Sequence, residues 1–395
     1  MVHQSFKMGM KVQLTVKKAN EHEKALEYAK VVGFALHNCG RLEGIMSWKW
    51  HLEVEYYYYP ILAAIGVPVN LLAIVILSRR NCGLSKCTTR YLVAMATVDL
   101  SVIVCEVILH RIAELYWVNT FLFHNTVCRS IMFLAPAAVA CSVWLTVAFT
   151  FDRFVAISSR NLRTRYCTER TALVVIVTLT ALFCLLNVPW PFAYNYYVRD
   201  QQGIEWGCRI RYHFYSLSSW IAFSWTQQLL VPFIPFCLIM LMNVLTVRRI
   251  LVASRVRRKL RDLSNEDPEI ANRRRSVILL LAISSSFMLL WGTTVVYFVL
   301  YRITNAFMSR GLKNTFASFE QTGILLQLLN TCTNTLIYTV TQRRFREQLI
   351  QVLMYPFTLT YIWEIVCVFF CSSKTDPNAR CHFGTDSGSF VGSDS

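Results

Sequence analysis

The chain has 395 residues, of which 55% are hydrophobic and only 16% are charged. Soluble domains carry about 25% charged residues, so a chain this apolar could not cover its own surface, and 14 Gly and 10 Pro are too few for a collagen-like or low-complexity chain. The 40 basic and 23 acidic residues leave a net charge of +17, which fits either nucleic-acid binding or basic loops beside a membrane.

Seven segments of the chain are apolar and long enough to cross a bilayer as helices, which takes about 20 residues. In chain order they are residues 56–78, 91–113, 130–151, 171–198, 214–247, 276–301 and 321–342. Six of them contain no Asp, Glu, Lys or Arg, whereas the second carries Asp99, Glu106 and Arg111, and ionisable residues inside a span are costly and usually functional. Their apolar residues are consecutive, unlike the alternating pattern of a membrane β-barrel. The sequence therefore predicts an all-α membrane protein, a seven-transmembrane helix bundle.

The basic residues indicate which side of the membrane each connection faces. They gather after the first span (Arg79, Arg80, Lys86, Arg90), after the third (Arg160, Arg163, Arg165, Arg170), between residues 248 and 275, and after the seventh (Arg343, Arg344, Arg346). Short loops rich in Lys and Arg face the cytoplasm, which puts the N-terminus outside a multi-pass plasma-membrane protein. Because the positive charge is divided among four membrane-adjacent loops, we expect no nucleic-acid partner.

The two ends of the chain differ from the bundle. Residues 1–55 are polar, with eight Lys or Arg and six Glu, and form either an extracellular tail or a start-site extension. Residues 56–341 form the seven-transmembrane domain. Residues 342–371 contain a late apolar stretch broken by Glu364, which fits a short amphipathic helix on the inner membrane surface better than an eighth span. Residues 372–395 are rich in Ser, Gly and Asp, and we expect a disordered cytoplasmic tail.

Membrane topology sorts the 14 cysteines of the chain. Cys128, at the start of the third span, and Cys208, between the fourth and fifth spans, lie on the outer, oxidising side, as does Cys39 in the tail. We expect a Cys128–Cys208 disulfide, which would fasten the longest outer loop to a helix end. Cys367 and Cys371 lie near the inner membrane surface and are expected lipidation sites.

Polar motifs recur at definite depths in the spans. They are Asn70 in the first, Asp99 in the second, Asp152-Arg153-Phe154 at the inner end of the third, Trp291 in the sixth and Asn334-x-x-x-Tyr338 in the seventh. Taken in order, with Cys128 at the outer end of the third, they resemble the rhodopsin-like (class A) G-protein-coupled receptors over about residues 56–348. Stretches such as SVWLTVAFTFDRFVAI are similar to orphan receptors related to the tryptophan- and phenylalanine-sensing branch. Thr293 and Thr335 stand where the family usually has Pro.

The resemblance implies two functional groups of residues. A sodium and activation network would comprise Asn70, Asp99, Ser142, Trp291, Asn330 and Asn334, holding Na⁺ or water at Asp99; the alternative is a polar packing network without an ion, and no other cofactor is implied. Coupling to a heterotrimeric G protein, with the Gq class favoured, would use Asp152, Arg153, Phe154, Leu162, Arg273 and Tyr338. Many relatives carry an acid, which pairs with the motif arginine, where this chain has Arg273. We therefore predict measurable ligand-independent signalling.

The same comparison narrows the ligand. Ala135 stands where amine receptors carry Asp, and Leu328 where opsins carry the retinal Lys, which argues against a biogenic amine and a photopigment. The outer halves of the spans instead offer a set of polar side chains above Trp291, namely Glu106, His110, Arg111, Gln227, Gln228 and Glu320. They suit a small zwitterion such as an aromatic amino acid or a short peptide. The alternative is that Glu106 and Arg111 satisfy each other or a neighbouring helix.

Other classes of function fit less well. A seven-helix transporter or channel would need inverted repeats or discontinuous helices, which the sequence does not show. An intramembrane enzyme needs a paired nucleophile and base or a metal cluster, and Asp99 is the only deep acid, so we predict no enzyme. A non-signalling receptor paralogue remains an alternative because of the unusual N-terminal tail.

Overall fold

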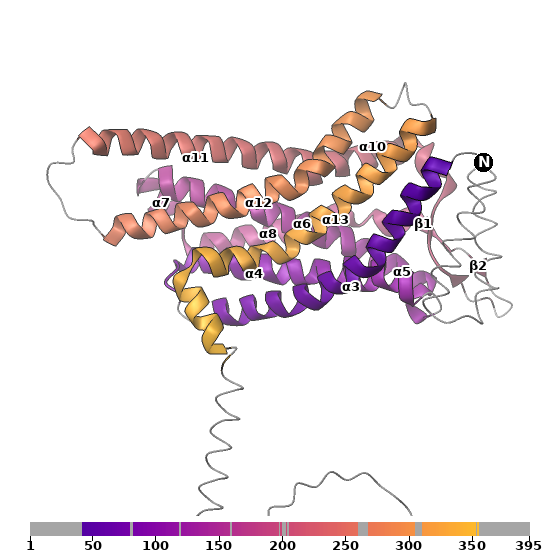
Figure 1. Cartoon of the computed structure of the whole chain (residues 1–395), viewed down its shortest axis with the longest axis horizontal. Helices are drawn as coiled ribbons and strands as arrows, with labels where there is room; N and C mark the ends of the chain where they lie inside the picture. The colour runs from indigo at the N-terminus through magenta and orange to yellow at the C-terminus, as the bar shows by residue number, and fades with distance from the viewer. Residues whose placement is uncertain are drawn as a thin grey trace, which may run out of the picture. The chain divides into compact units, whose positions relative to one another are not determined.

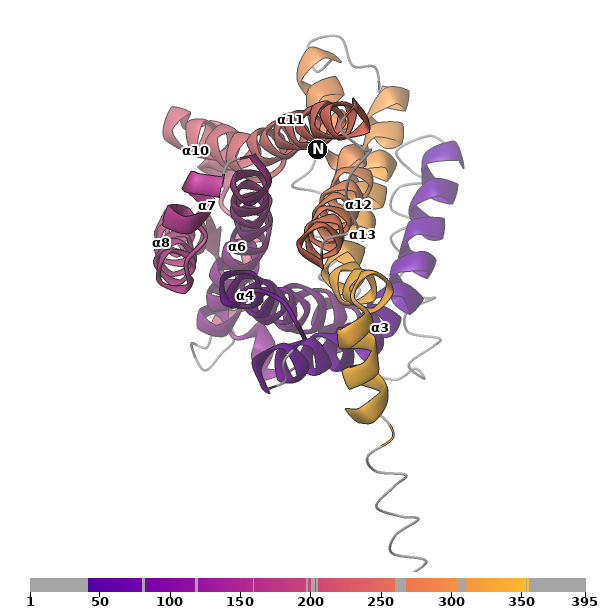
Figure 2. The ribbon, with the colours of Figure 1, turned by 90° about the vertical axis from the view of Figure 1, so that its left-hand side faces the viewer.

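Long helices make up most of the chain, and they lie side by side in a bundle (Figures 1 and 2). The computed structural model describes residues 42–79, 82–117, 120–158, 160–196, 198–199, 203, 205–259, 268–304, 310–352 and 354. Residues up to Gln348 belong to one structural unit, and those from Leu349 to a second.

The helices follow one another with short connections. The first half of the chain forms α3 (Leu42–Arg79), α4 (Lys86–Val102), the π-helical η2 (Ile103–Ile112), α5 (Ala113–Tyr116), the 3₁₀ turn η3 (Phe121–Phe123), α6 (Asn125–Ser158), α7 (Arg160–Tyr166), α8 (Glu169–Asn187) and α9 (Trp190–Ala193). The second half forms the 3₁₀ turn η4 (Tyr212–Tyr215), α10 (Ser218–Gln228), the π-helical η5 (Leu229–Phe233), α11 (Ile234–Lys259), α12 (Pro268–Thr304) and α13 (Arg310–Thr341). Residues 343–348 are helical as well, and so are residues 349–352 of the second unit.

The predicted membrane bundle is confirmed. Among the described residues, six helices or helix series are long and apolar enough to span a bilayer: His51–Arg79, Lys86–Tyr116, Asn125–Ser158, Glu169–Ala193, Ser218–Val252 and Val277–Tyr301. The seventh long helix, α13, carries more polar residues, and Asn330, Thr331 and Asn334 are buried against its neighbours. Its lower hydropathy therefore reflects a polar face directed into the bundle.

The first helix begins earlier than the sequence pattern predicted. It starts at Leu42, inside the segment expected to be a tail, and runs without interruption to Arg79 despite Pro60 and Pro68. The charge-free run marked only the part that crosses the hydrocarbon region, because a helix can continue into water beyond it. The tail prediction for residues 1–41 and the disordered tail at residues 372–395 lie outside the described residues.

Side-chain caps and one glycine turn fix where the inner ends of the helices begin. Ser85 Oγ accepts a hydrogen bond from the Thr88 amide at the start of α4, and Thr168 Oγ1 does the same for Thr171 at the start of α8. Gly83 precedes α4 with a φ of +71°, a backbone conformation that favours glycine.

Helix α6 lies in the middle of the bundle and contacts α4, α8, α11 and α12 (Figure 2). Helix α13 packs against both α3 and α12, which closes the ring of helices. Gly66 allows α3 to approach its neighbours closely, since a Cβ there would lie 2.5 Å from Ile103 Cδ1 and 2.8 Å from Cys332 Sγ. Small residues at such contacts are typical of helices packed in membranes.

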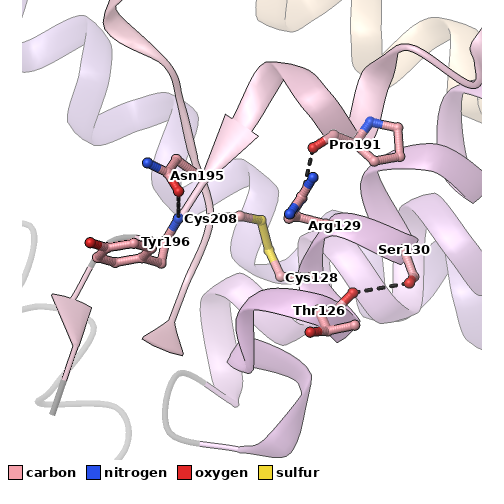
Figure 3. The surroundings of a disulfide bond; sticks show 8 residues. All are labelled: Thr126, Cys128, Arg129, Ser130, Pro191, Asn195, Tyr196 and Cys208. Atoms are coloured by element: carbon pink, nitrogen blue, oxygen red, sulfur yellow. Dashed lines mark hydrogen bonds between the residues drawn. A yellow bond between two sulfur atoms is a disulfide. The ribbon is translucent and has the colours of Figure 1, made fainter. Parts of the chain in front are cut away.

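The connection between α9 and η4 forms two short antiparallel ladders. Strand β1 (Tyr194–Asn195) pairs with β4 (Arg209–Ile210), and β2 (Val198–Arg199) pairs with β3 (Glu205–Trp206). The predicted disulfide is present: Cys208, between β3 and β4, is bonded to Cys128 in the first turns of α6 (Figure 3). Beside it, Arg129 Nε donates to the Pro191 carbonyl at 2.7 Å. The disulfide therefore holds this connection to α6, and the Arg129 bond holds α6 to α9.

Candidate functional site

A buried carboxylate lies at the centre of the bundle. Asp99 of α4 has no exposed surface, and its Oδ1 accepts a hydrogen bond from Ser142 Oγ of α6 at 2.6 Å. Its Oδ2 accepts one from Asn334 Nδ2 of α13 at 2.7 Å. One carboxyl group thus connects three helices through two hydrogen bonds.

A small cavity of about 10 Å³ lies beside Ser142, the residue that bonds Asp99, and is also lined by Trp291 and Asn330, whereas Asp99 itself does not line it. Both Trp291 Nε1 and Asn330 Oδ1 are buried without a hydrogen-bond partner. A volume of this size holds about one water molecule. The hydroxyl and amide oxygens beside the carboxylate are ligands that Na⁺ accepts, and the indole N–H would instead donate to a water, so the site fits an ion, a water or both.

The remaining residue of the expected network lies on α3. Asn70 Nδ2 donates to the Gly66 carbonyl in its own helix at 2.9 Å and to the Thr331 carbonyl of α13 at 3.0 Å. Asn70 is buried, and it links α3 to the same stretch of α13 that carries Asn330 and Asn334. The structure thus brings the six residues of the expected network into three neighbouring groups: the Asp99 bonds, the cavity and the Asn70 link.

A second polar group occupies the inner end of α6. Arg153 donates through Nε to Asp152 Oδ2 at 2.9 Å and also through an η nitrogen to the same oxygen. Both residues are 6% exposed, and the Arg153 guanidinium lies 5.8 Å from the centre of the Phe149 ring. The guanidinium is therefore folded back onto its own helix and sheltered from solvent.

The other residues expected to meet a G protein lie near this end. Phe154 is half-buried, and Leu162 of α7 is 45% exposed. Tyr338 of α13 is buried, packs edge-on against Phe345, and has a hydroxyl with no hydrogen-bond partner. Arg273 belongs to α12, but its side chain lies outside the described residues.

The polar residues at the outer half of the second span pair with one another. Glu106 accepts from Arg111 Nε at 2.8 Å and lies 3.0 Å from His110 Nδ1. The π-helical geometry of η2 places a residue beside the one five positions on, which brings Glu106 against Arg111. Glu106, predicted from the sequence as a ligand contact, is thus bound by two side chains of its own helix.

The remaining residues expected in a ligand pocket do not converge with this group. Gln227 Nε2 donates to the Leu186 carbonyl at 3.0 Å and so faces α8 rather than a pocket. Gln228 is half-buried on α10, next to η5. Glu320 is exposed and accepts from Tyr297 Oη at 2.8 Å. Trp291 is 4% exposed and stacks on Phe287.

Two cysteines near the inner motif were not singled out by the sequence. Cys87 at the start of α4 and Cys167 before α8 both contact Asp152. No spacing rule relates positions 65 or 15 residues from Asp152 to it. The proposed lipidation sites Cys367 and Cys371 lie outside the described residues.

Comparisons with known proteins agree with this arrangement. The sequence profile described as 7 transmembrane receptor (rhodopsin family) matches residues 69–338. Gastrin/cholecystokinin type B receptors are similar over 154 residues: the dog (Canis lupus familiaris) and pig (Sus scrofa) proteins at 31% identity and the rat (Rattus norvegicus) protein at 30%. That stretch is 38% of this chain and 33% of each relative, so the match spans about a third of their length.

Proposed function

The chain belongs to the rhodopsin family of seven-transmembrane receptors, and on that premise we propose that it binds an extracellular ligand in the outer half of the bundle and activates a heterotrimeric G protein at the cytoplasmic face. The observation that carries the proposal is the buried Asp152–Arg153 pair at the inner end of the central helix α6. In this proposal the N-terminus lies outside and the basic loops face the cytoplasm.

The inner pair supplies the switching element of the proposal. A guanidinium that is 6% exposed and bound to its neighbour cannot reach a partner protein. Agonist binding shifts an existing equilibrium towards a state in which Arg153 leaves Asp152 and meets the G protein, together with Leu162 and Tyr338. Arg273 stands on α12 where many relatives carry an acid that binds the motif arginine. Because an arginine cannot hold Arg153 at rest in this way, we expect ligand-independent signalling.

Asp99 supplies the second element. Its carboxylate, Ser142 and the Asn330 oxygen are the residues that would hold Na⁺ in the adjoining cavity. A bound cation would balance the buried negative charge. The hydrogen bonds that Ser142 and Asn334 donate would orient the Asp99 carboxylate. Because those bonds connect α4, α6 and α13, occupancy of the site would favour one arrangement of the three helices.

For the ligand we propose an aromatic amino acid or a short peptide. Gastrin and cholecystokinin, after which the relatives are named, should be among the first compounds tested as ligands. Glu106 is already bound by Arg111 and His110, so a ligand amine would have to displace them, whereas a ligand carboxylate would meet the two bases. We therefore expect the acidic group of the ligand to be the stronger determinant of binding.

The test is a signalling screen in cells that express the epitope-tagged receptor. Calcium, inositol phosphate and cAMP are measured against L-amino acids, short peptides, gastrin and cholecystokinin, with surface expression quantified in parallel. A Gq-class response, an increase in calcium and inositol phosphate that Arg153→Ala abolishes without changing surface level, is the expected result. A transmembrane current or solute uptake would support the transporter alternative. Silence of the surface-expressed receptor to every compound, with no basal signal, would support a non-signalling paralogue.

A further inference from the structure

Two thiols contact Asp152, the residue whose carboxylate holds Arg153. Cys87 Sγ, at the start of α4, donates to Asp152 Oδ1 at 3.2 Å. Cys167 Sγ, just before α8, donates to the Asp152 main-chain oxygen at 3.5 Å. The two contacts reach α6 from separate segments, and they meet at the one residue whose other carboxylate oxygen binds Arg153.

We propose that Cys87 and Cys167 are positioning residues for the Asp152–Arg153 pair, with Cys87 fixing the carboxylate and Cys167 fixing the backbone of α6 beneath it. The expected change in signalling rests on the proposed function. The positioning of Asp152 by the two thiols does not, because it can be measured without a G protein.

Cys87 and the Asp152 carboxylate are both buried. Asp152 is 6% exposed and Cys87 is 2% exposed, so water has little access to Oδ1. A buried carboxylate oxygen that loses its donor carries a desolvation cost. It can recover only by rotating or by moving towards solvent, and either movement turns Oδ2 away from Arg153. The thiol therefore stabilises the state in which Arg153 is folded back.

Cys167 acts through a protonated thiol. Burial and the nearby Asp152 carboxylate raise the pKa of Cys167 to about 12, so it remains a protonated donor at cellular pH. Its bond connects the segment between α7 and α8 to the carbonyl of Asp152, which lies in the last two turns of α6. A thiol is a weak donor compared with a hydroxyl. The hydrogen bond from Cys167 is therefore weak, which suits an Asp152–Arg153 pair that must open on activation.

The test measures amide hydrogen exchange at the inner end of α6, residues 152–158, in purified receptor in lipid nanodiscs. Cys87→Ala and Cys87→Val remove the donor at smaller and larger volume, whereas Cys87→Ser keeps a donor. Cys82→Ala is the matched control, because Cys82 is also a buried thiol beside the first inner loop but bonds the Ile76 carbonyl instead. Cys167→Ala and Cys167→Ser form the second pair.

We expect Cys87→Ala and Cys87→Val to increase exchange about threefold to tenfold, the range for losing one hydrogen bond of about 1 kcal/mol. Cys87→Ser and Cys82→Ala should leave exchange near the wild-type value, and agonist-free signalling should increase in the same order as exchange. If Cys87→Ser behaves like Cys87→Ala, or if Cys82→Ala has an equal effect, the positioning role is overturned. If exchange follows the donor pattern but every variant is silent in signalling, positioning stands and the proposed coupling is wrong.

Discussion

Removal of one hydroxyl tests whether Asp99 organises the centre of the bundle. Ser142→Ala deletes the donor that lies 2.6 Å from Asp99 Oδ1 and leaves the fully buried carboxylate with Asn334 alone. Leaving a buried acceptor without its donor costs about 1–3 kcal/mol. At about 2–4 °C for each kcal/mol, the value for domains of 150–250 residues, the melting temperature should decrease by about 2–12 °C.

The measurement is thermal unfolding of purified receptor in nanodiscs, followed by intrinsic tryptophan fluorescence. Thr150→Val is the matched control, since it removes a buried hydroxyl from the same helix. That hydroxyl bonds only the Thr146 carbonyl one turn earlier. Its melting temperature should decrease by less than that of Ser142→Ala. Equal decreases for the two variants would refute the idea that the Asp99 bond contributes more than an ordinary hydroxyl contact.

Four further predictions concern other parts of the molecule. Replacing choline chloride with NaCl at constant ionic strength should raise the melting temperature of the wild type but not of Asp99→Asn. An equal increase in both would show that Na⁺ does not bind at this site. Gly66→Ala should destabilise the receptor by about 1–3 kcal/mol because its Cβ would overlap two neighbouring side chains, whereas Gly292→Ala, with nothing within 4 Å, should not; thermal unfolding of the pair decides. Cys128→Ser opens a disulfide between positions 80 residues apart, worth up to about 4.5 kcal/mol of chain entropy, and should sharply reduce surface expression in flow cytometry; normal expression and melting would contradict that. Alkylation of Cys167, followed by mass spectrometry, should be slow at pH 7 and accelerate about tenfold per pH unit up to pH 9, because its pKa is raised to about 12; a rate that levels off below pH 9 would contradict this.

The sequence predicted the bundle and the disulfide because both follow from simple physical limits. A bilayer requires about 20 apolar residues for each helix, and only oxidising compartments retain disulfides. The start of α3 at Leu42 could not be predicted this way, because hydropathy reports the part of a helix that meets lipid and not the polar turns beyond it.

The polar sites were predictable only as sets of residues. Asp99, Ser142 and Asn334 were expected together, but their hydrogen bonds depend on how three helices are rotated about their axes. The contact between Cys87 and Asp152 joins positions 65 residues apart and left no local pattern. For Glu106 the sequence left three partners open, a ligand, Arg111 or a neighbouring helix, and the choice depends on a helical geometry that composition does not encode.

That geometry has a practical consequence for anyone who maps this receptor by mutagenesis. Between Ile103 and Ile112 the backbone is wound more loosely than in the turns before it. A helical wheel drawn with one constant angle through the second span would therefore assign its outer residues to the wrong faces. Scanning substitutions along it should be interpreted with two different periods, which meet at Val102.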